Sequence, residues 1–287
     1  MTAQVEPFSI KGRHIDFSLR TYLMGILNVT PDSFSDGGKY FSVDAAVAHA
    51  VKMVEEGADI IDVGGESSRP KGLYGQGSQK ISAEEELKRV IPVIERISHA
   101  SDVIISIDTT KSLVAEKALE AGASIVNDIS GLKFDEGIAD VVAKCHASLV
   151  LMHMQGTPET MQFHPTYNDV VLEVKEELRD ACDIAITAGV KQIIIDPGIG
   201  FGKNVEHNLT LIKHLKEFTS LGFPVLIGTS RKGFIGALLD VSVDERVEGT
   251  AASVAVAIMN GANIIRVHDV KEMKRVAIIV DAIRNVT

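Results

Sequence analysis

The sequence predicts an α/β fold, a single (β/α)8 TIM barrel preceded by a short N-terminal β-hairpin. Eight short runs rich in isoleucine and valine recur along the 287 residues, and amphipathic segments of helical length separate most of them. No change in composition divides the chain, which favours one closed barrel over two domains. An open dinucleotide-binding sheet would carry a glycine fingerprint after its first strand, and none follows Val29.

The chain begins with a segment that differs from the repeating unit. Residues 6–18 alternate between apolar and polar side chains around Lys11-Gly12, a pattern typical of a small hairpin. We expect this hairpin to close the bottom of the barrel. The predicted organisation is therefore an N-terminal extension over residues 1–20 and the barrel over residues 21–287.

The eight runs are the predicted parallel strands. They cover residues 23–29, 59–64, 103–108, 124–129, 149–153, 192–196, 225–228 and 264–268. Glycines precede four of them as helix stops, because glycine tolerates the left-handed backbone that ends a helix: Gly57, Gly122, Gly189 and Gly261. Ser82, with Glu85 three residues later, has the spacing of a helix start.

Composition excludes several classes of protein. The net charge of −10 disfavours a nucleic-acid partner. No stretch is long and apolar enough for a membrane span, and the first residues do not read as a signal peptide. Cys145 and Cys182 have no disulfide or metal spacing, which fits a reducing cytoplasm.

Polar residues lie in or at the ends of most predicted strands, where barrel enzymes place their chemistry. These residues are Asn28, Asp62, Asp108, Asn127, Asp196, Arg266 and His268. A single aspartate at a strand end is more often a helix cap or a loop ion pair than catalytic. Several that converge on one rim favour a shared polar ligand instead. Asp62 is the weakest candidate, since it could simply organise the glycine turn that follows it.

Three loops add candidates. The long loop after the first strand carries the acid Asp36, and the loop after the second carries Ser68 and Arg69, which suit an anion. The segment 229–236 enters a helix, where backbone N–H groups and Lys232 favour anions. The histidines lack zinc-ligand spacing. Methionines near the fifth strand read as core filling, except Met152, which we keep as a pocket residue.

Seven ordered motifs resemble those of the dihydropteroate synthase family. They are Met24-Gly-Ile-Leu-Asn-Val-Thr-Pro-Asp-Ser-Phe-Ser-Asp-Gly-Gly, Gly64-Gly-Glu-Ser-Ser-Arg-Pro, Ser106-Ile-Asp-Thr, Asn127-Asp-Ile, Asp196-Pro-Gly-Ile-Gly-Phe, Thr229-Ser-Arg-Lys and Arg266-Val-His-Asp. The resemblance runs from about residue 22 to the end. It implies a transferase of folate biosynthesis, and a sulfonamide target, that joins 6-hydroxymethyl-7,8-dihydropterin diphosphate to p-aminobenzoate with release of diphosphate. It also implies Mg²⁺ and a homodimer, for which the last helices are the expected surface.

The resemblance implies a role for each matching residue. Asp196 would accept from the N–H edge of the pterin, and the remaining pterin contacts would come from Asn127, Asp108, Lys232 and Met152. Asn28 would bind Mg²⁺, while Arg266 and His268 would bind diphosphate oxygens. Asp36, Asp108 and Lys232 would be the catalytic groups, and Ser68 with Arg69 would hold the p-aminobenzoate carboxylate.

This chain departs from the family pattern at three places. Ser68 stands where threonine is usual, residues 71–80 lengthen the second loop, and Gly233 stands where many members have serine. Three other classes of protein fit these residues less well. A methyltetrahydrofolate-binding methyltransferase barrel needs no diphosphate contacts, a silent pterin-binding paralogue would have eroded loops, and a phosphate aldolase would have a strand-end lysine where Asp196 stands.

Overall fold

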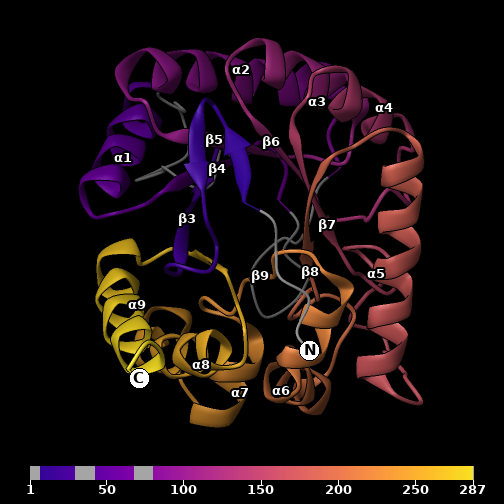
Figure 1. Ribbon diagram of the computed structural model, residues 1–287, viewed down its shortest axis with the longest axis vertical. Coiled ribbons are helices and arrows are strands. Elements are labelled where there is room, and N and C mark those ends of the chain that lie inside the picture. The colour runs from indigo at the N-terminus through magenta and orange to yellow at the C-terminus, as the bar shows by residue number, and fades with distance from the viewer. Residues whose placement is uncertain (1–6, 30–42, 68–79, 287) are drawn as a thin grey trace.

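The structure, a computed structural model, describes residues 7–29, 43–67 and 80–286. Within them eight parallel strands form one sheet in the order β8-β7-β6-β5-β4-β3-β10-β9. The edge strands β8 and β9 meet through a parallel bridge between Ile195 and Val225 and a 3.0 Å hydrogen bond from Ile195 N to Pro224 O. The sheet thus closes into the predicted barrel, with helices around it (Figure 1).

Each predicted strand is present, and its ends differ by no more than one residue from the prediction. The strands are β3 (Tyr22–Asn28), β4 (Ile60–Gly64), β5 (Ile104–Asp108), β6 (Ile125–Asp128), β7 (Ser148–Met152), β8 (Gln192–Asp196), β9 (Leu226–Ile227) and β10 (Ile264–Val267). The strand β9 is only two residues long, and just before it the side chain of Asn263 accepts from the backbone N–H of Val225 at 2.9 Å.

Helices follow the strands along the chain. They are α1 (Val43–Glu55), α2 (Ala83–Ala100), α3 (Ser112–Glu120), α4 (Gly137–Lys144), α5 (Val170–Thr187), α6 (Val205–Lys213), α7 (Gly233–Leu239), α8 (Val247–Met259) and α9 (Val270–Arg284). Two 3-10 segments, Leu215–Leu221 and Val243–Glu245, lie between them. Ser82 caps α2 by accepting from Glu85 N at 3.2 Å, and the four predicted helix-stop glycines all have positive φ.

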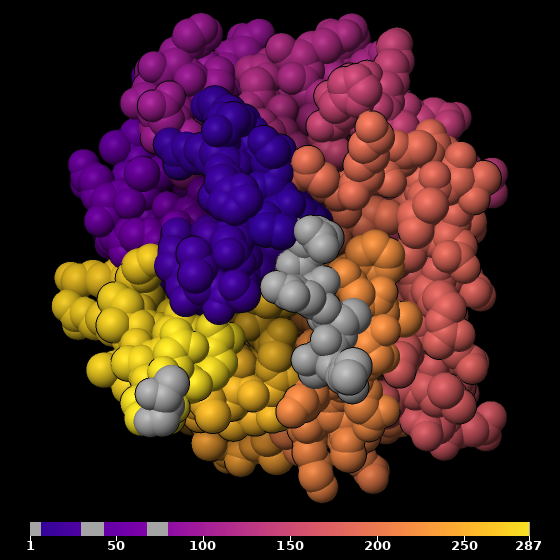
Figure 2. Space-filling view, viewed as in Figure 1, coloured from indigo at the N-terminus to yellow at the C-terminus, as the bar shows by residue number. Residues whose placement is uncertain are grey.

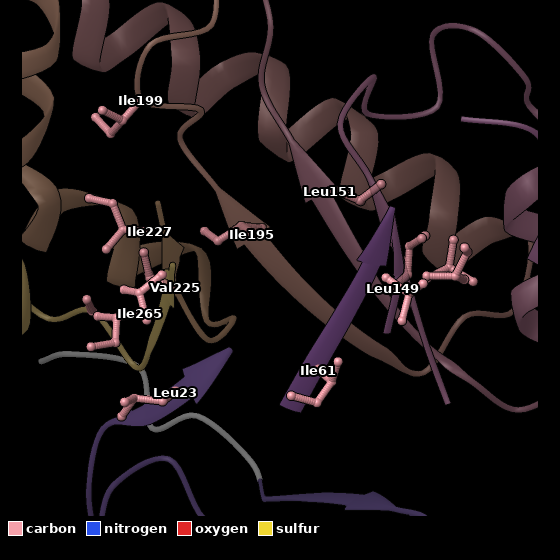
Figure 3. Close-up of a cluster of buried hydrophobic side chains, with 14 of the residues drawn as sticks. Leu23, Ile61, Leu149, Leu151, Ile195, Ile199, Val225, Ile227 and Ile265 are labelled. Carbon is pink, nitrogen blue, oxygen red and sulfur yellow. The ribbon is translucent and has the colours of Figure 1, made fainter. Parts of the chain in front are cut away.

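Alternate side chains of the strands face the helices. Leu23, Ile61, Leu149 and Ile195 belong to this outer layer, which forms the main apolar core with the helices (Figure 3). No helix among the described residues has the length and apolar character to span a membrane.

The intervening side chains fill the barrel interior with an apolar layer. One residue comes from each strand: Met24, Ile60, Ile104, Ile125, Val150, Ile194, Leu226 and Ile264. The hairpin of β1 (Phe8–Ile10) and β2 (Arg13–Ile15) contributes to the same cluster through Phe8, Ile10 and Ile15. It lies over this end of the barrel (Figure 2), so the interior is closed at the N-terminal ends of the strands, as predicted.

Candidate active site

Most polar candidates lie one level above the apolar layer of the barrel. Counting two residues along each strand from that layer gives Asp62, Ser106, Asn127, Met152, Asp196 and Arg266. Because side chains alternate with a period of two, these positions face the same interior. Asn28 and Asp108 lie two residues further, at the ends of β3 and β5. The mouth at the carboxyl ends of the strands is therefore polar, above an apolar floor.

Arg266 holds two carboxylates at the centre of this mouth. Its Nε lies 2.6 Å from Asp62 Oδ2, and its Nη2 lies 2.6 Å from Asp108 Oδ2. Asn127 donates from Nδ2 to the same Asp62 oxygen at 3.0 Å. Asp62 is fully buried, so it links Arg266 to Asn127 rather than organising the turn that follows it. The sequence predicts only a diphosphate contact for Arg266, and the structure adds these two carboxylate partners.

Two polar atoms near this ion-pair cluster are buried without a partner. Among the described residues, Asp62 Oδ1 and Ser106 Oγ have no hydrogen bond. Because such atoms are uncommon in native proteins and each requires an explanation, we interpret them as the places where a polar ligand or a water is bound.

Burial perturbs the ionisable groups of the mouth. It raises the pKa of Asp108 to about 7, and the Arg266 guanidinium opposes that rise. Burial also lowers the pKa of Lys232 to about 8, with the charge of Arg266 acting in the same direction. Binding of a charged ligand would change these pKa values, as is common at functional sites.

Asp196 ends β8 and is almost fully buried. Its Oδ1 accepts from Gly198 N at 2.7 Å. Burial raises the pKa of Asp196, while the Gly198 N–H group and the charges of Lys232 and Arg266 lower it. The side chain is thus a hydrogen-bond acceptor inside the mouth, held in place from its own loop.

An apolar wall faces these polar groups. Met152 belongs to a small buried cluster with Ile129, Met154, Met161 and Phe201. Lys232, directly before α7, places its Nζ 4.0 Å from the centre of the Phe201 ring, a cation–π distance. A flat ring could therefore be bound between apolar contacts and the polar groups of the mouth.

The loop after β9 meets the end of β10. His268 lies just after β10, with Nδ1 3.0 Å from Ser230 Oγ, and that oxygen also accepts from His268 N at 3.1 Å. The fork of Arg231 is bound by Asp269 at 3.0 and 2.6 Å. Within the loop, Lys232 rather than Arg231 therefore supplies charge to the mouth.

Three predicted site residues, Asp36, Ser68 and Arg69, lie outside the described residues, as does most of the lengthened second loop. All the others converge on one mouth. The sequence interpretation missed two buried groups next to it, Lys203 and His153. The available signal was a lysine at the end of the glycine-rich segment 198–203, close after a strand end.

The residues fit Mg²⁺ bound together with a phosphate. The described residues contain no group of three or more His, Cys, Asp or Glu side chains that could hold a metal. Asn28 is half-buried at the end of β3 and offers one amide oxygen. Mg²⁺ commonly takes one or two protein oxygens and completes its shell with water and substrate phosphate.

Comparison with known proteins shows which enzymes this chain is similar to. The family described as pterin binding enzyme matches residues 24–268. The dihydropteroate synthase of Bacillus subtilis is 48% identical, over 98% of this chain and 95% of that protein. A Yersinia pestis dihydropteroate synthase with a sulfonamide drug superposes with a TM-score of 0.91 at 42% identity, covering 98% of this chain and 100% of that one. A Xanthomonas albilineans dihydropteroate synthase with 4-aminobenzoic acid gives 0.90 at 41% identity, covering 99% and 100%.

Proposed function

This chain belongs to the pterin-binding enzymes and, within them, to the dihydropteroate synthases, and we propose from this how its residues perform the reaction. The enzyme is a transferase of folate biosynthesis. It joins 6-hydroxymethyl-7,8-dihydropterin diphosphate to p-aminobenzoate, giving 7,8-dihydropteroate and diphosphate. The observation that carries the assignment of residues is the buried acceptor Asp196, which shares the polar mouth with Asn127 and Arg266.

The pterin would bind with its N–H edge on Asp196. Two adjacent N–H donors match the two oxygens of a carboxylate. Asn127, Asp108 and Lys232 would contact the other polar atoms of the ring, and Met152 would cover one face. The unpartnered Asp62 and Ser106 oxygens support a polar ligand at this depth.

In the chemical step the bond between the pterin methylene carbon and the diphosphate oxygen breaks, and diphosphate leaves with the electron pair. The positive charge spreads into the electron-rich dihydropterin, where Asp108 and Asp36 would stabilise it. The neutral amine of p-aminobenzoate then forms the new carbon–nitrogen bond and loses a proton to solvent water. No nucleophile from the protein is needed.

Diphosphate would be bound at the rim. His268 and the donors of Arg266 not used by carboxylates would contact its oxygens, and Asn28 would hold Mg²⁺ with them. When bound, Mg²⁺ neutralises the charge of the leaving group. Ser68, Arg69 and the backbone N–H groups at the start of α7 would hold the p-aminobenzoate carboxylate.

The test is diphosphate release from the purified protein with Mg²⁺ and both substrates. Release should require the pterin diphosphate and p-aminobenzoate together and should fall when the metal is chelated. Asp102→Asn, a change at an exposed aspartate, is the matched control for Asp196→Asn. Release without p-aminobenzoate at the full rate would contradict the assigned reaction.

We also propose a homodimer that pairs through α8 and α9, which lie side by side (Figure 1). Large apolar side chains are exposed on both helices: Val256, Met259, Ile278, Ile279 and Ile283. The two free cysteines, Cys145 and Cys182, support a reducing, cytoplasmic location.

Sedimentation measures the dimer directly. Ile279→Glu places a charge on the α9 surface, where the side chain is 61% exposed, and should yield monomer. Ile184→Glu on α5, where the side chain is 52% exposed, should leave the dimer intact. A dimer in both variants would mean that the two helices do not pair.

A further inference from the structure

Lys203 carries a buried amino group to which the roles above assign nothing. Its side chain lies in the loop between β8 and α6 and is 2% exposed. Its Nζ lies 2.9 Å from Phe201 O, 2.9 Å from His153 Nδ1 and 3.4 Å from His153 O. An ammonium group has three N–H donors and no acceptor, which matches these three atoms. Lys203 therefore binds the end of β7 and its own loop at once.

The two segments that Lys203 joins are in backbone contact. A Cβ on Gly198 would lie 1.9 Å from His153 O, and one on Gly202 would lie 2.4 Å from Gln155 O. Both glycines also have positive φ. Because any side chain at these positions would force the segments apart, the position of one segment sets the position of the other.

The same loop carries two groups that face the mouth. Gly198 N binds the Asp196 carboxylate at 2.7 Å, and the Phe201 ring lies under Lys232. Lys203 holds the carbonyl of Phe201 itself. A shift of this loop against β7 would thus move the acceptor and the apolar wall together.

We propose that Lys203 is a positioning residue for pterin recognition, which holds the loop after β8 against the end of β7 so that Asp196 and Phe201 keep their places. The proposal rests on the assignment of Asp196 to the pterin. Lys203 does not contact the ligand. It acts through the carbonyl of Phe201 and through His153.

Burial lowers the pKa of Lys203 to about 7, so the ammonium form prevails below that pH. Asp196 and Glu177 on α5 favour the charged form, whereas Lys232 and Lys133 oppose it. Glu177 lies behind His153, with Oε2 3.4 Å from Nε2 of the imidazole, and Lys133 binds the same oxygen at 2.6 Å.

The test compares Lys203→Met with the wild type. Methionine has a similar length and removes the three donors. The probe is 6-hydroxymethylpterin without diphosphate, titrated in the absence of Mg²⁺, and we expect its affinity to fall about tenfold, the scale on which supporting contacts alter a site. The KM for pterin diphosphate should rise, whereas the KM for p-aminobenzoate at saturating pterin diphosphate should stay unchanged. Wild-type pterin affinity in Lys203→Met would overturn the proposal.

Lys133→Met is the matched control. Lys133 donates to Met154 O, in the same segment, at 3.2 Å, but its side chain is half-exposed. It should keep wild-type pterin affinity, and an equal loss in both variants would overturn the proposal because it would indicate general loosening. If Lys203→Met does not fold, His153→Leu removes one of the three acceptors, and unchanged pterin affinity in it would likewise overturn the proposal.

Asp196→Asn distinguishes a failure of the pterin assignment from a failure of the role of Lys203. If it keeps pterin affinity, the pterin assignment itself is wrong, and the proposal falls with it. If it loses affinity while Lys203→Met does not, only the role of Lys203 is wrong.

Discussion

Replacing Arg266 with methionine should lower the free energy of unfolding by more than the removal of a surface ion pair does. In the folded protein this guanidinium lies 2.6 Å from Asp62 Oδ2 and 2.6 Å from Asp108 Oδ2. Removing one member of a buried pair leaves an uncompensated charge and costs about 3–5 kcal/mol. Domains of ordinary stability unfold with about 5–15 kcal/mol, so the variant should fold with a greatly reduced margin.

The deficit should grow with pH. The pKa of Asp108 is about 7 in the presence of Arg266, which lowers it, so the variant should have a higher value. A carboxyl pKa raised by folding contributes stability that is present below the unfolded value and is lost as pH rises through the folded value. Wild type has completed that loss just above pH 7, whereas the variant continues to lose about 1.4 kcal/mol per pH unit.

Urea unfolding at pH 6 and pH 8.5 measures both effects. Arg20→Met is the control, because Arg20 makes two contacts with Asp59, at 2.9 and 2.7 Å, but its side chain is 42% exposed. That pair should contribute about 1 kcal/mol or less. Equal deficits in the two variants, or a deficit in Arg266→Met that does not change with pH, would refute the reasoning.

Three further outcomes are expected. Asp196→Asn should abolish measurable pterin binding by calorimetry, because an amide N–H group would face the ring N–H groups, and unchanged affinity would rule this out. Gly233→Pro should fold, since proline is accepted at the first helical position and Lys232 before it is already extended. It should raise the KM for p-aminobenzoate because one N–H group is lost. Gly233→Ser should change that KM by a factor equivalent to roughly 0.5–1.5 kcal/mol. Wild-type kinetics in the proline variant would exclude this carboxylate site. Burial lowers the pKa of Lys203 to about 7, so the unfolded chain binds the extra proton between pH 7 and 9. Wild type should therefore gain roughly 2 kcal/mol over Lys203→Met across that range in urea titrations, and a constant difference would show that the amine does not titrate there.

The barrel and most of the mouth could be predicted from the sequence because their signals are local. In several strands two branched apolar residues are followed by a polar one, as in Ile60-Ile-Asp62 and Ile194-Ile-Asp196. With a period of two, the first apolar residue and the polar residue share the inner face. The same count places Asp62 on the inner face, although the glycine turn that follows it offers a competing explanation for an aspartate there.

What could not be predicted depends on segments that meet only in the folded chain. Lys203 is separated from His153 by 50 residues, and Arg266 from Asp62 by 204. Neither pairing leaves a periodic signal. Arg231 lies in a segment that the sequence predicts to bind anions, yet its guanidinium binds Asp269. The sequence alone cannot distinguish such an internal ion pair from a contact with a ligand.

Among the described residues, the hairpin closes the barrel interior at the N-terminal ends of the strands, so the open end is the mouth at their carboxyl ends. Phe8 and Phe17 pack in the innermost apolar layer. A ligand could therefore pass through that end only if the hairpin detached from the barrel. We therefore expect a ligand at the depth of Asp196 to enter before one that binds nearer the rim, and to leave after it. In the proposed arrangement the pterin binds deep in the barrel and p-aminobenzoate binds nearer the rim, so the closed base predicts that the pterin substrate binds first.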